Sequence, residues 1–172
     1  MKPSAYLLAP MLLALSLAGQ IGCSCPSIEV HFSPGGSPTA AIVETLDSAK
    51  RSVLVQAYSF TSDPIASALI RAHGRGVAVQ VVVDRSQASD RNVAVPSLKA
   101  AGIPVWVDRG HAIQHNKVMV VDRRIVITGS FNFSRAAEGR NAENLVVIND
   151  PKIAARYVAN FEGHKKHSEY HL

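Results

Sequence analysis

The pattern of hydrophobic and polar positions predicts strands that alternate with helices over the first two thirds of the chain. Apolar helical spacing follows the pairs Ser37-Pro38 and Asp63-Pro64, where a polar capping residue precedes a proline at the first helical position. A further helix is expected between Asn92 and Ala101, although Pro96 lies inside it. Runs rich in valine and isoleucine predict strands over residues 28–32, 52–58, 77–83 and 104–107.

The last third of the chain predicts a hairpin, another strand and a terminal helix. Two short apolar runs, 118–121 and 125–128, are separated by three residues, which indicates a tight hairpin, and a further strand follows at 145–148. The pair Asp150-Pro151 repeats the cap-and-proline signal and predicts a helix of about four turns. The polar tail, residues 164–172, is expected to be frayed.

This order of elements predicts the fold class. Strands alternating with helices favour parallel βαβ units with helices on both faces of a sheet. The run 77–83 is almost continuously apolar, as in a strand buried on both faces. The hairpin adds an antiparallel element. We therefore predict an α/β fold, an α/β/α sandwich around a mixed, mostly parallel central sheet.

The first 22 residues predict a secretory signal peptide rather than part of the fold. Lys2 gives a positive start, residues 6–17 are apolar, and small residues up to Gly22 offer a cleavage region. The apolar run is shorter than the roughly 20 residues of a membrane span, so an uncleaved anchor is the alternative. Lipid attachment at Cys23 also stays open, although Gln20 stands where a lipoprotein signal normally has an apolar residue. The expected location is periplasmic or secreted.

The remaining segment, residues 23–172, has the size of a single domain. Its two cysteines, Cys23 and Cys25, offer no disulfide framework, because a bridge at that spacing would be strained. The formal net charge of +5 fits a polyanionic partner, either nucleic acid or an acidic membrane surface. An ordinary basic protein fits the charge equally well, so charge alone decides nothing.

One motif places an imidazole beside an ammonium group. His115 and Lys117 are two residues apart, and in a strand such residues project to the same face. A neutral imidazole nitrogen can attack phosphorus and form a covalent phosphohistidine, while the lysine holds a phosphate oxygen. The pair predicts a nucleophile and its electrostatic partner for phosphodiester cleavage.

A second motif, Gly-Ser-x-Asn-x-Ser at 129–134, supplies neutral hydrogen-bond donors. Ser130, Asn132 and Ser134 share one face of a strand by the same alternation. We expect Ser130 and Asn132 to donate hydrogen bonds to the phosphate oxygens that Lys117 holds.

Two carboxylates have different expected roles. Asp122 is an odd number of positions from Lys117 and stands at the hairpin turn, so we predict that it braces the turn or pairs with a nearby arginine. Glu143 begins the next strand and is expected to orient His115 by accepting a hydrogen bond from its second ring nitrogen. An exposed glutamate at a strand end is the alternative.

Neither a metal ion nor another cofactor is predicted. His164, His167 and His171 share a helical face, but they fall in the polar tail, where solvated side chains are expected. Activity should therefore survive chelation. A general acid is still needed, and His111 has no partner lysine. A symmetric homodimer would solve this, because its two-fold axis can bring two copies of His115 together.

In these residues the chain resembles the phospholipase D superfamily, and in particular small exported bacterial endonucleases with one motif per chain. The resemblance implies an α/β/α sandwich and a dimer with one shared active site that hydrolyses phosphodiesters without metal through a phosphohistidine. His115, Lys117, Ser130, Asn132 and Glu143 match the family's site positions, and Asp122 matches its motif aspartate. The matching segments are 57–61, 76–84, 113–115, 128–134 and 142–144.

The substrate expected first is nucleic acid: DNA, with RNA as a second substrate. Arginines near the motif could bind phosphates. The alternative is a phospholipase D that cleaves the headgroup of a membrane phosphatidyl lipid, which needs an exposed apolar patch. A binding protein on an inactivated scaffold is the third possibility, and the intact motif argues against it. The arginines near the motif that could bind phosphates in a nuclease are Arg109, Arg123, Arg124, Arg135 and Arg140.

Overall fold

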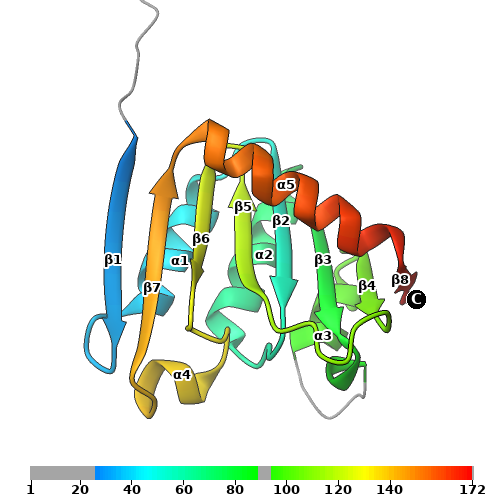
Figure 1. The fold of residues 1–172 in the computed structure, drawn as a ribbon, viewed down its shortest axis with the longest axis horizontal. Coiled ribbons are helices and arrows are strands. Elements are labelled where there is room, and N and C mark those ends of the chain that lie inside the picture. Colours follow the sequence, from blue (N-terminus) through cyan, green and yellow to red (C-terminus); the bar gives the residue numbers. More distant parts are fainter. Residues whose placement is uncertain (1–25, 89–93, 172) are drawn as a thin grey trace, which may run out of the picture.

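The computed structural model describes residues 26–88 and 94–171, so the predicted signal peptide and Cys23 lie outside the described residues. The described chain forms one eight-stranded sheet with helices on both faces (Figure 1). In order across the sheet, the strands are β1 (Ser27–Ser33), β7 (Glu143–Asn149), β6 (Ile125–Gly129), β5 (Lys117–Val121), β2 (Ser52–Ala57), β3 (Ala78–Asp84), β4 (Val105–Asp108) and β8 (Ser168–Tyr170). The predicted α/β sandwich with a mixed sheet is confirmed.

The predicted elements are present, with three additions: α4, β8 and a short 3₁₀ turn at Arg85–Gln87. The helices are α1 (Pro38–Ser48), α2 (Asp63–Gly74), α3 (Ala94–Ala100), α4 (Arg135–Gly139) and α5 (Pro151–Lys166).

The expectation of a mostly parallel sheet is wrong. Only β2–β3 and β3–β4 pair in parallel among the described strands. These are the strands joined by helical crossovers, which parallel pairing requires. The connections from β5 to β6 and from β6 to β7 are too short for such crossovers, so those pairs are antiparallel. The first strand closes against β7, with Ser27 opposite Asn149 and Ser33 opposite Glu143.

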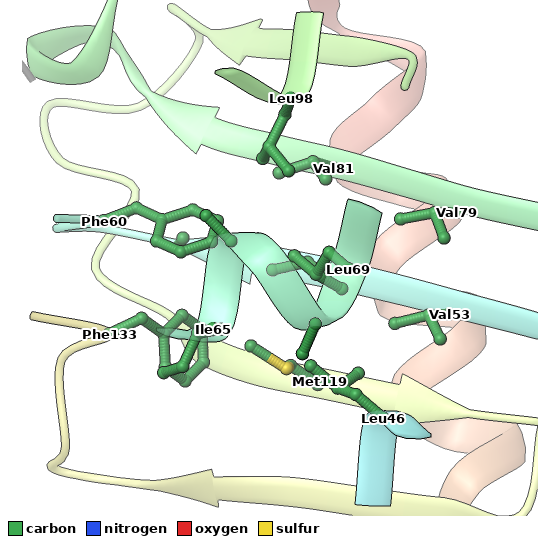
Figure 2. Packing of buried hydrophobic residues seen from close by; sticks show 14 of the residues in the cluster. Leu46, Val53, Phe60, Ile65, Leu69, Val79, Val81, Leu98, Met119 and Phe133 are labelled. Carbon is green, nitrogen blue, oxygen red and sulfur yellow. The ribbon is translucent and has the colours of Figure 1, made fainter. Parts of the chain in front are cut away.

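Two apolar clusters hold the layers together. Helices α1, α2 and α3 cover one face through residues such as Leu46, Leu69 and Leu98 (Figure 2). The second cluster lies under α5, which crosses the opposite face and packs Val158 and Phe161 against it (Figure 1). The strand predicted to be buried on both faces is β3, and its last four residues are indeed buried.

The helix starts agree with the sequence in part. Asp150 caps α5 as predicted, since its carboxylate accepts from the backbone N–H groups of Lys152 and Ile153. Ser37 does not cap α1: its backbone is left-handed and its hydroxyl makes no capping bond. Pro96 is tolerated because it lies in the first turn of α3, where a backbone N–H has no helical partner.

The polar tail is ordered as far as His171, contrary to expectation. Helix α5 continues to Lys166, and β8 then pairs antiparallel with β4 at the edge of the sheet. Aromatic contact favours this arrangement, because the Tyr170 ring lies 5.4 Å from the ring of Trp106. Lys165 lies over the Trp106 ring at 4.6 Å, which adds a cation–π contact. None of the described helices combines the length and apolar character that crossing a bilayer requires.

Candidate active site

The loop that carries His115 is fixed by a buried carboxylate. Asp84, at the end of β3, accepts a hydrogen bond from the backbone N–H of Gln114 at 2.8 Å. The Gln114 side chain in turn accepts from the N–H of Asn116 at 2.7 Å. Burial raises the pKa of Asp84, but hydrogen bonds from Ser86 and Gln114 outweigh it and hold the pKa below its ordinary value. His115 itself remains exposed, as a nucleophile requires.

Lys117 begins β5 and is buried, although it is a charged residue. Its ammonium group donates to the carbonyl oxygen of His115 at 2.7 Å. Burial lowers the pKa of Lys117 from its ordinary value, and attraction by Glu143 works in the opposite direction. The site therefore holds a partly desolvated cation against the backbone of His115, where its attraction for an anion is stronger than in water.

Tyr58 completes the surroundings of the histidine. Its ring centroid lies 4.5 Å from that of His115, and the Lys117 ammonium is 4.9 Å from the same ring. The backbone N–H of Tyr58 also donates to the carbonyl of Asn116. This tyrosine follows β2, which pairs with β5, so strand pairing brings it to the site. Sequence reasoning assigned it no role, because the pairing of those strands was not known.

The side chains of residues 130–134 point alternately toward the site and into the core. Phe131 and Phe133 are fully buried, and the Phe133 carbonyl accepts from the backbone of Thr61 and Ser62. This alternation turns Ser130 and Asn132 toward the site, as predicted. Ser134 does not join them: its hydroxyl caps α4 by accepting from the N–H of Ala137.

A glycine is required at position 129 because the backbone of β7 passes very close to it. Its φ of +145° lies in a region that L-residues rarely adopt, and a Cβ there would collide with the backbone carbonyl of Asn144. The same carbonyl accepts from the N–H of Phe131 at 3.1 Å. The glycine thus sets the position of Ser130 relative to β7.

Glu143 binds Ser130 rather than His115. Within the described residues, its carboxylate accepts from the Ser130 hydroxyl at 2.6 Å and from the Asn141 amide at 3.0 Å. The expected bond to His115 is not formed in this structure. The Ser130 oxygen also accepts from the backbone N–H and the side-chain amide of Asn144. Glu143 therefore orients the serine hydroxyl and lies close enough to Lys117 to affect its pKa.

These groups line one open depression of about 440 Å³. The Asn132 side chain also lines it, and the buried Oδ1 of that side chain has no hydrogen-bond partner within the described part of the chain. An imidazole, an ammonium, a hydroxyl and an amide thus converge, with one carboxylate behind the serine. The lining residues are His115, Lys117, Gly129, Ser130, Asn132 and Glu143.

Asp122 lies at the opposite end of β5, which separates it from Lys117 by roughly 17 Å of strand. Its carboxylate accepts from the backbone N–H groups of Lys50, Arg51 and Ser52 at 2.9, 2.7 and 3.0 Å. Burial raises its pKa, but these backbone bonds dominate and keep the pKa low. Asp122 fastens the hairpin to the connection between α1 and β2. It braces the turn, as predicted, and the Arg51 side chain donates to its backbone carbonyl.

The arginines near the motif do not form one phosphate-binding group. Arg123 and Arg124 belong to the hairpin at the far end of the sheet, so their expected role at the phosphate is wrong. Arg109 pairs with Glu169, and Arg135 pairs with Asp63. Arg140 follows α4 and is exposed at the end of the sheet where the site lies.

Comparison with known proteins agrees with this geometry. The family model described as "Cardiolipin synthase, PLD-like domain" matches residues 42–165. The chain belongs to the phospholipase D superfamily. With a single copy of the motif, it is a single-motif, phospholipase D-like phosphodiesterase.

Similar proteins within the phospholipase D superfamily include both enzymes and solved structures. A phospholipase D of Rickettsia typhi is 39% identical over 146 residues, which cover 85% of this chain and 72% of the relative. The mitochondrial cardiolipin hydrolase of Chlamydomonas reinhardtii is 30% identical and covers 82% of this chain and 62% of that protein. The crystal structure of Nuc from Salmonella typhimurium, a phospholipase D family member, superposes with a TM-score of 0.80 at 40% identity. The superposition covers 84% of this chain and 97% of the Nuc chain.

Proposed function

We propose that this protein is an endonuclease that hydrolyses DNA, with RNA as a second substrate, through a phosphohistidine on His115. The observation that carries the proposal is the convergence of an exposed imidazole with Lys117, Ser130 and Asn132 in one depression. The imidazole can form a covalent bond to phosphorus, and the Lys117 ammonium and the Asn132 amide can donate to its non-bridging oxygens, while Glu143 holds the hydrogen of the Ser130 hydroxyl.

The reaction would proceed in two displacements. An imidazole nitrogen of His115 attacks phosphorus, so that a P–N bond forms as the P–O bond to the leaving group breaks. The leaving oxygen takes a proton from a general acid. Water then attacks the phosphohistidine and gives its proton back to that group, which frees His115. Lys117 and Asn132 stabilise the negative charge in both steps, and Glu143 holds the Ser130 hydroxyl beside them.

The character of the site supports a chemical step without metal. Divalent-metal phosphodiesterases gather several carboxylates around the scissile phosphate. Glu143 is the one carboxylate that lines this depression, and both of its oxygens already accept hydrogen bonds. The buried Lys117 ammonium supplies the positive charge instead.

The missing general acid supports a homodimer. His115 is the one histidine that lines the depression, and His111 is bonded to Asp108 outside it. A second copy of His115 from a two-fold partner would supply the acid. An uncovered surface is available for such a partner: Ile28, Val30 and Phe32 of the edge strand are more than half exposed. Phe32 lies opposite Asn144, which contacts Ser130 in the site.

Several observations favour nucleic acid as the substrate. The depression is open and polar, which suits a phosphate backbone, and the chain is basic overall. The similarity to Nuc, 97% of which is covered, also favours nucleic acid.

We also propose that residues 1–22 direct the protein to the periplasm or outside the cell.

Phospholipid hydrolysis is the second candidate, and an exposed apolar side chain near the site favours it. Ile113, two residues before His115, is 55% exposed and could meet the apolar part of a membrane. The relatives named phospholipase D and cardiolipin hydrolase agree with this alternative.

Parallel assays in EDTA would separate the two candidates. The purified protein and its His115→Ala variant are given plasmid DNA and vesicles of phosphatidylcholine or cardiolipin. We expect the wild type alone to nick DNA. Headgroup release with intact DNA would establish the lipid reaction instead, and equal nicking by the variant would remove His115 from the mechanism.

A mixing experiment would test the shared site. Wild type and His115→Ala are unfolded together in different ratios and refolded to form mixed dimers. If both copies of His115 serve one reaction, only pure wild-type dimers are active, so activity falls with the square of the wild-type fraction. A linear decrease would show that each chain works alone.

A further inference from the structure

Three histidines and a buried aspartate form a cluster away from the phosphodiesterase site. Asp108 is the last residue of β4, and His111 follows in the loop that leads toward His115. His164 lies in the last turn of α5, and His167 directly follows the helix. The Asp108 side chain is completely buried, and the His164 side chain is only 14% exposed, so the predicted solvation of His164 is wrong.

The ring nitrogens of the cluster all point at one oxygen. Asp108 Oδ2 lies 2.9 Å from His111 Nδ1, 2.9 Å from His164 Nδ1 and 3.4 Å from His167 Nε2. One carboxylate oxygen offers about two lone pairs, so it cannot accept well from three N–H groups at once. Three neutral imidazoles that face one carboxylate are instead a typical donor set for a metal ion.

The separations fit a small tetrahedral site. One nitrogen from each histidine and one carboxylate oxygen all lie within 4.8 Å of one another. Zinc bonds of about 2.0–2.2 Å place tetrahedral ligands roughly 3.3–3.5 Å apart, so modest side-chain rotations would suffice. Three nitrogen donors disfavour Mg²⁺ and Ca²⁺, which prefer oxygen.

The surroundings hold the ligands in place. The other carboxylate oxygen, Asp108 Oδ1, accepts from the backbone N–H groups of Gly110 and His111, which fixes the carboxylate as the outer partners of metal ligands do. At Gly110 the absence of a side chain leaves room for His167, because a Cβ there would lie 3.0 Å from that ring.

We propose that Asp108, His111, His164 and His167 form a structural binding site for one Zn²⁺ ion. All four positions are filled by protein side chains, as in structural rather than catalytic zinc sites. The ion would clamp the end of α5 and the start of β8 to the end of β4. It would also anchor the loop that ends at His115, without entering the reaction.

Metal titration of the full chain tests this directly. The protein is stripped with EDTA, the chelator is removed, and ZnCl₂ is added during calorimetry against a competing chelator. We expect one Zn²⁺ per chain, bound more tightly than about 1 µM. A hundredfold excess of Zn²⁺ over the dissociation constant should raise Tm by about 5–10 °C. Absence of saturable binding would leave only a hydrogen-bonded cluster and overturn the proposal.

Variants assign the ligands. His111→Gln/His167→Gln changes two side chains that are 48% and 42% exposed, so the variant should fold, yet its zinc affinity should fall more than about a hundredfold. His73→Gln, on α2, is the matched control and should bind like the wild type. Unchanged affinity in the double variant would refute the site.

A spectroscopic readout separates this site from the phosphodiesterase reaction. Co²⁺ should give the strong visible absorption of a tetrahedral site in wild type and in His115→Ala, and not in the double variant. Because binding is measured without turnover, it stands even if the proposed nuclease activity fails. Loss of the cobalt spectrum in His115→Ala would place the metal at the wrong site and contradict the proposal.

Discussion

Replacement of Asp122 by alanine should lower the free energy of unfolding without disabling catalysis. The change removes an acceptor for three backbone N–H groups, those of Lys50, Arg51 and Ser52. A hydrogen bond to a charged acceptor contributes about 1.5–3 kcal/mol, but water can replace it at the exposed Lys50 and Arg51. The left-handed backbone at position 122, with φ of 53°, adds less than about 1 kcal/mol, because aspartate tolerates this conformation only somewhat better than alanine does.

The expected loss is therefore about 3 kcal/mol in the free energy of unfolding, or a Tm lower by about 6–12 °C for a domain of this size. Asp122→Asn should lose less, because its oxygen can still accept from Arg51 and Ser52 while its amide faces the Lys50 N–H. Asp47→Asn, which breaks a surface ion pair with Arg71, is the control and should change stability far less.

Urea unfolding followed by the fluorescence of Trp106, the single tryptophan, measures the stability of each variant. Phosphodiesterase activity is measured at a temperature where each variant is folded. We expect activity per folded molecule close to that of the wild type. A wild-type unfolding curve for Asp122→Ala, or a tenfold loss of kcat in the folded variant, would refute the role of Asp122 as a brace of the hairpin.

Three further predictions concern the site and its supports. Gly129→Ala should lower both stability and activity, because the new Cβ meets the Asn144 carbonyl and shifts the serine that follows; wild-type kinetics would contradict this. Tyr58→Phe should keep most activity, whereas Tyr58→Leu should lose the ring contact with His115 and lower kcat, measured on the same DNA substrate. Stability should fall as pH drops below about 4, since the stabilisation by carboxylates with lowered folded-state pKa is present above their unfolded pKa and lost as they protonate. Urea unfolding at pH 7, 4 and 3 checks this for Asp84 and Asp122.

Local sequence patterns predicted most of the fold and the main residues of the site. The spacing of His115 and Lys117, and of Ser130 and Asn132, predicted that they lie together, because the first pair leads into β5, the second follows β6, and the two meet at the same end of the sheet. Asp122 could be separated from them because it stands at the hairpin turn, beyond the far end of β5. What escaped prediction depends on contacts between distant segments. The order of the strands, the partner of Glu143 and the position of Tyr58 follow from which strands pair, and sequence periodicity does not encode that.

The tail shows the same limit. Its polar residues resembled a solvated end, yet Trp106 and Asp108 on β4 provide partners for Tyr170 and His164. A short polar segment can be ordered by a few specific contacts that have no periodic signature.

The pairing of β1 with β7 has a consequence for the order of folding. The first strand to be synthesised finds its place only when residues 143–149 have been made, because Ser27 pairs with Asn149. Contacts between such distant positions form late and slowly. Until then the apolar side chains of β1 have no strand beside them. For the export that we propose, this topology delays completion of the sheet until nearly all of the chain has emerged.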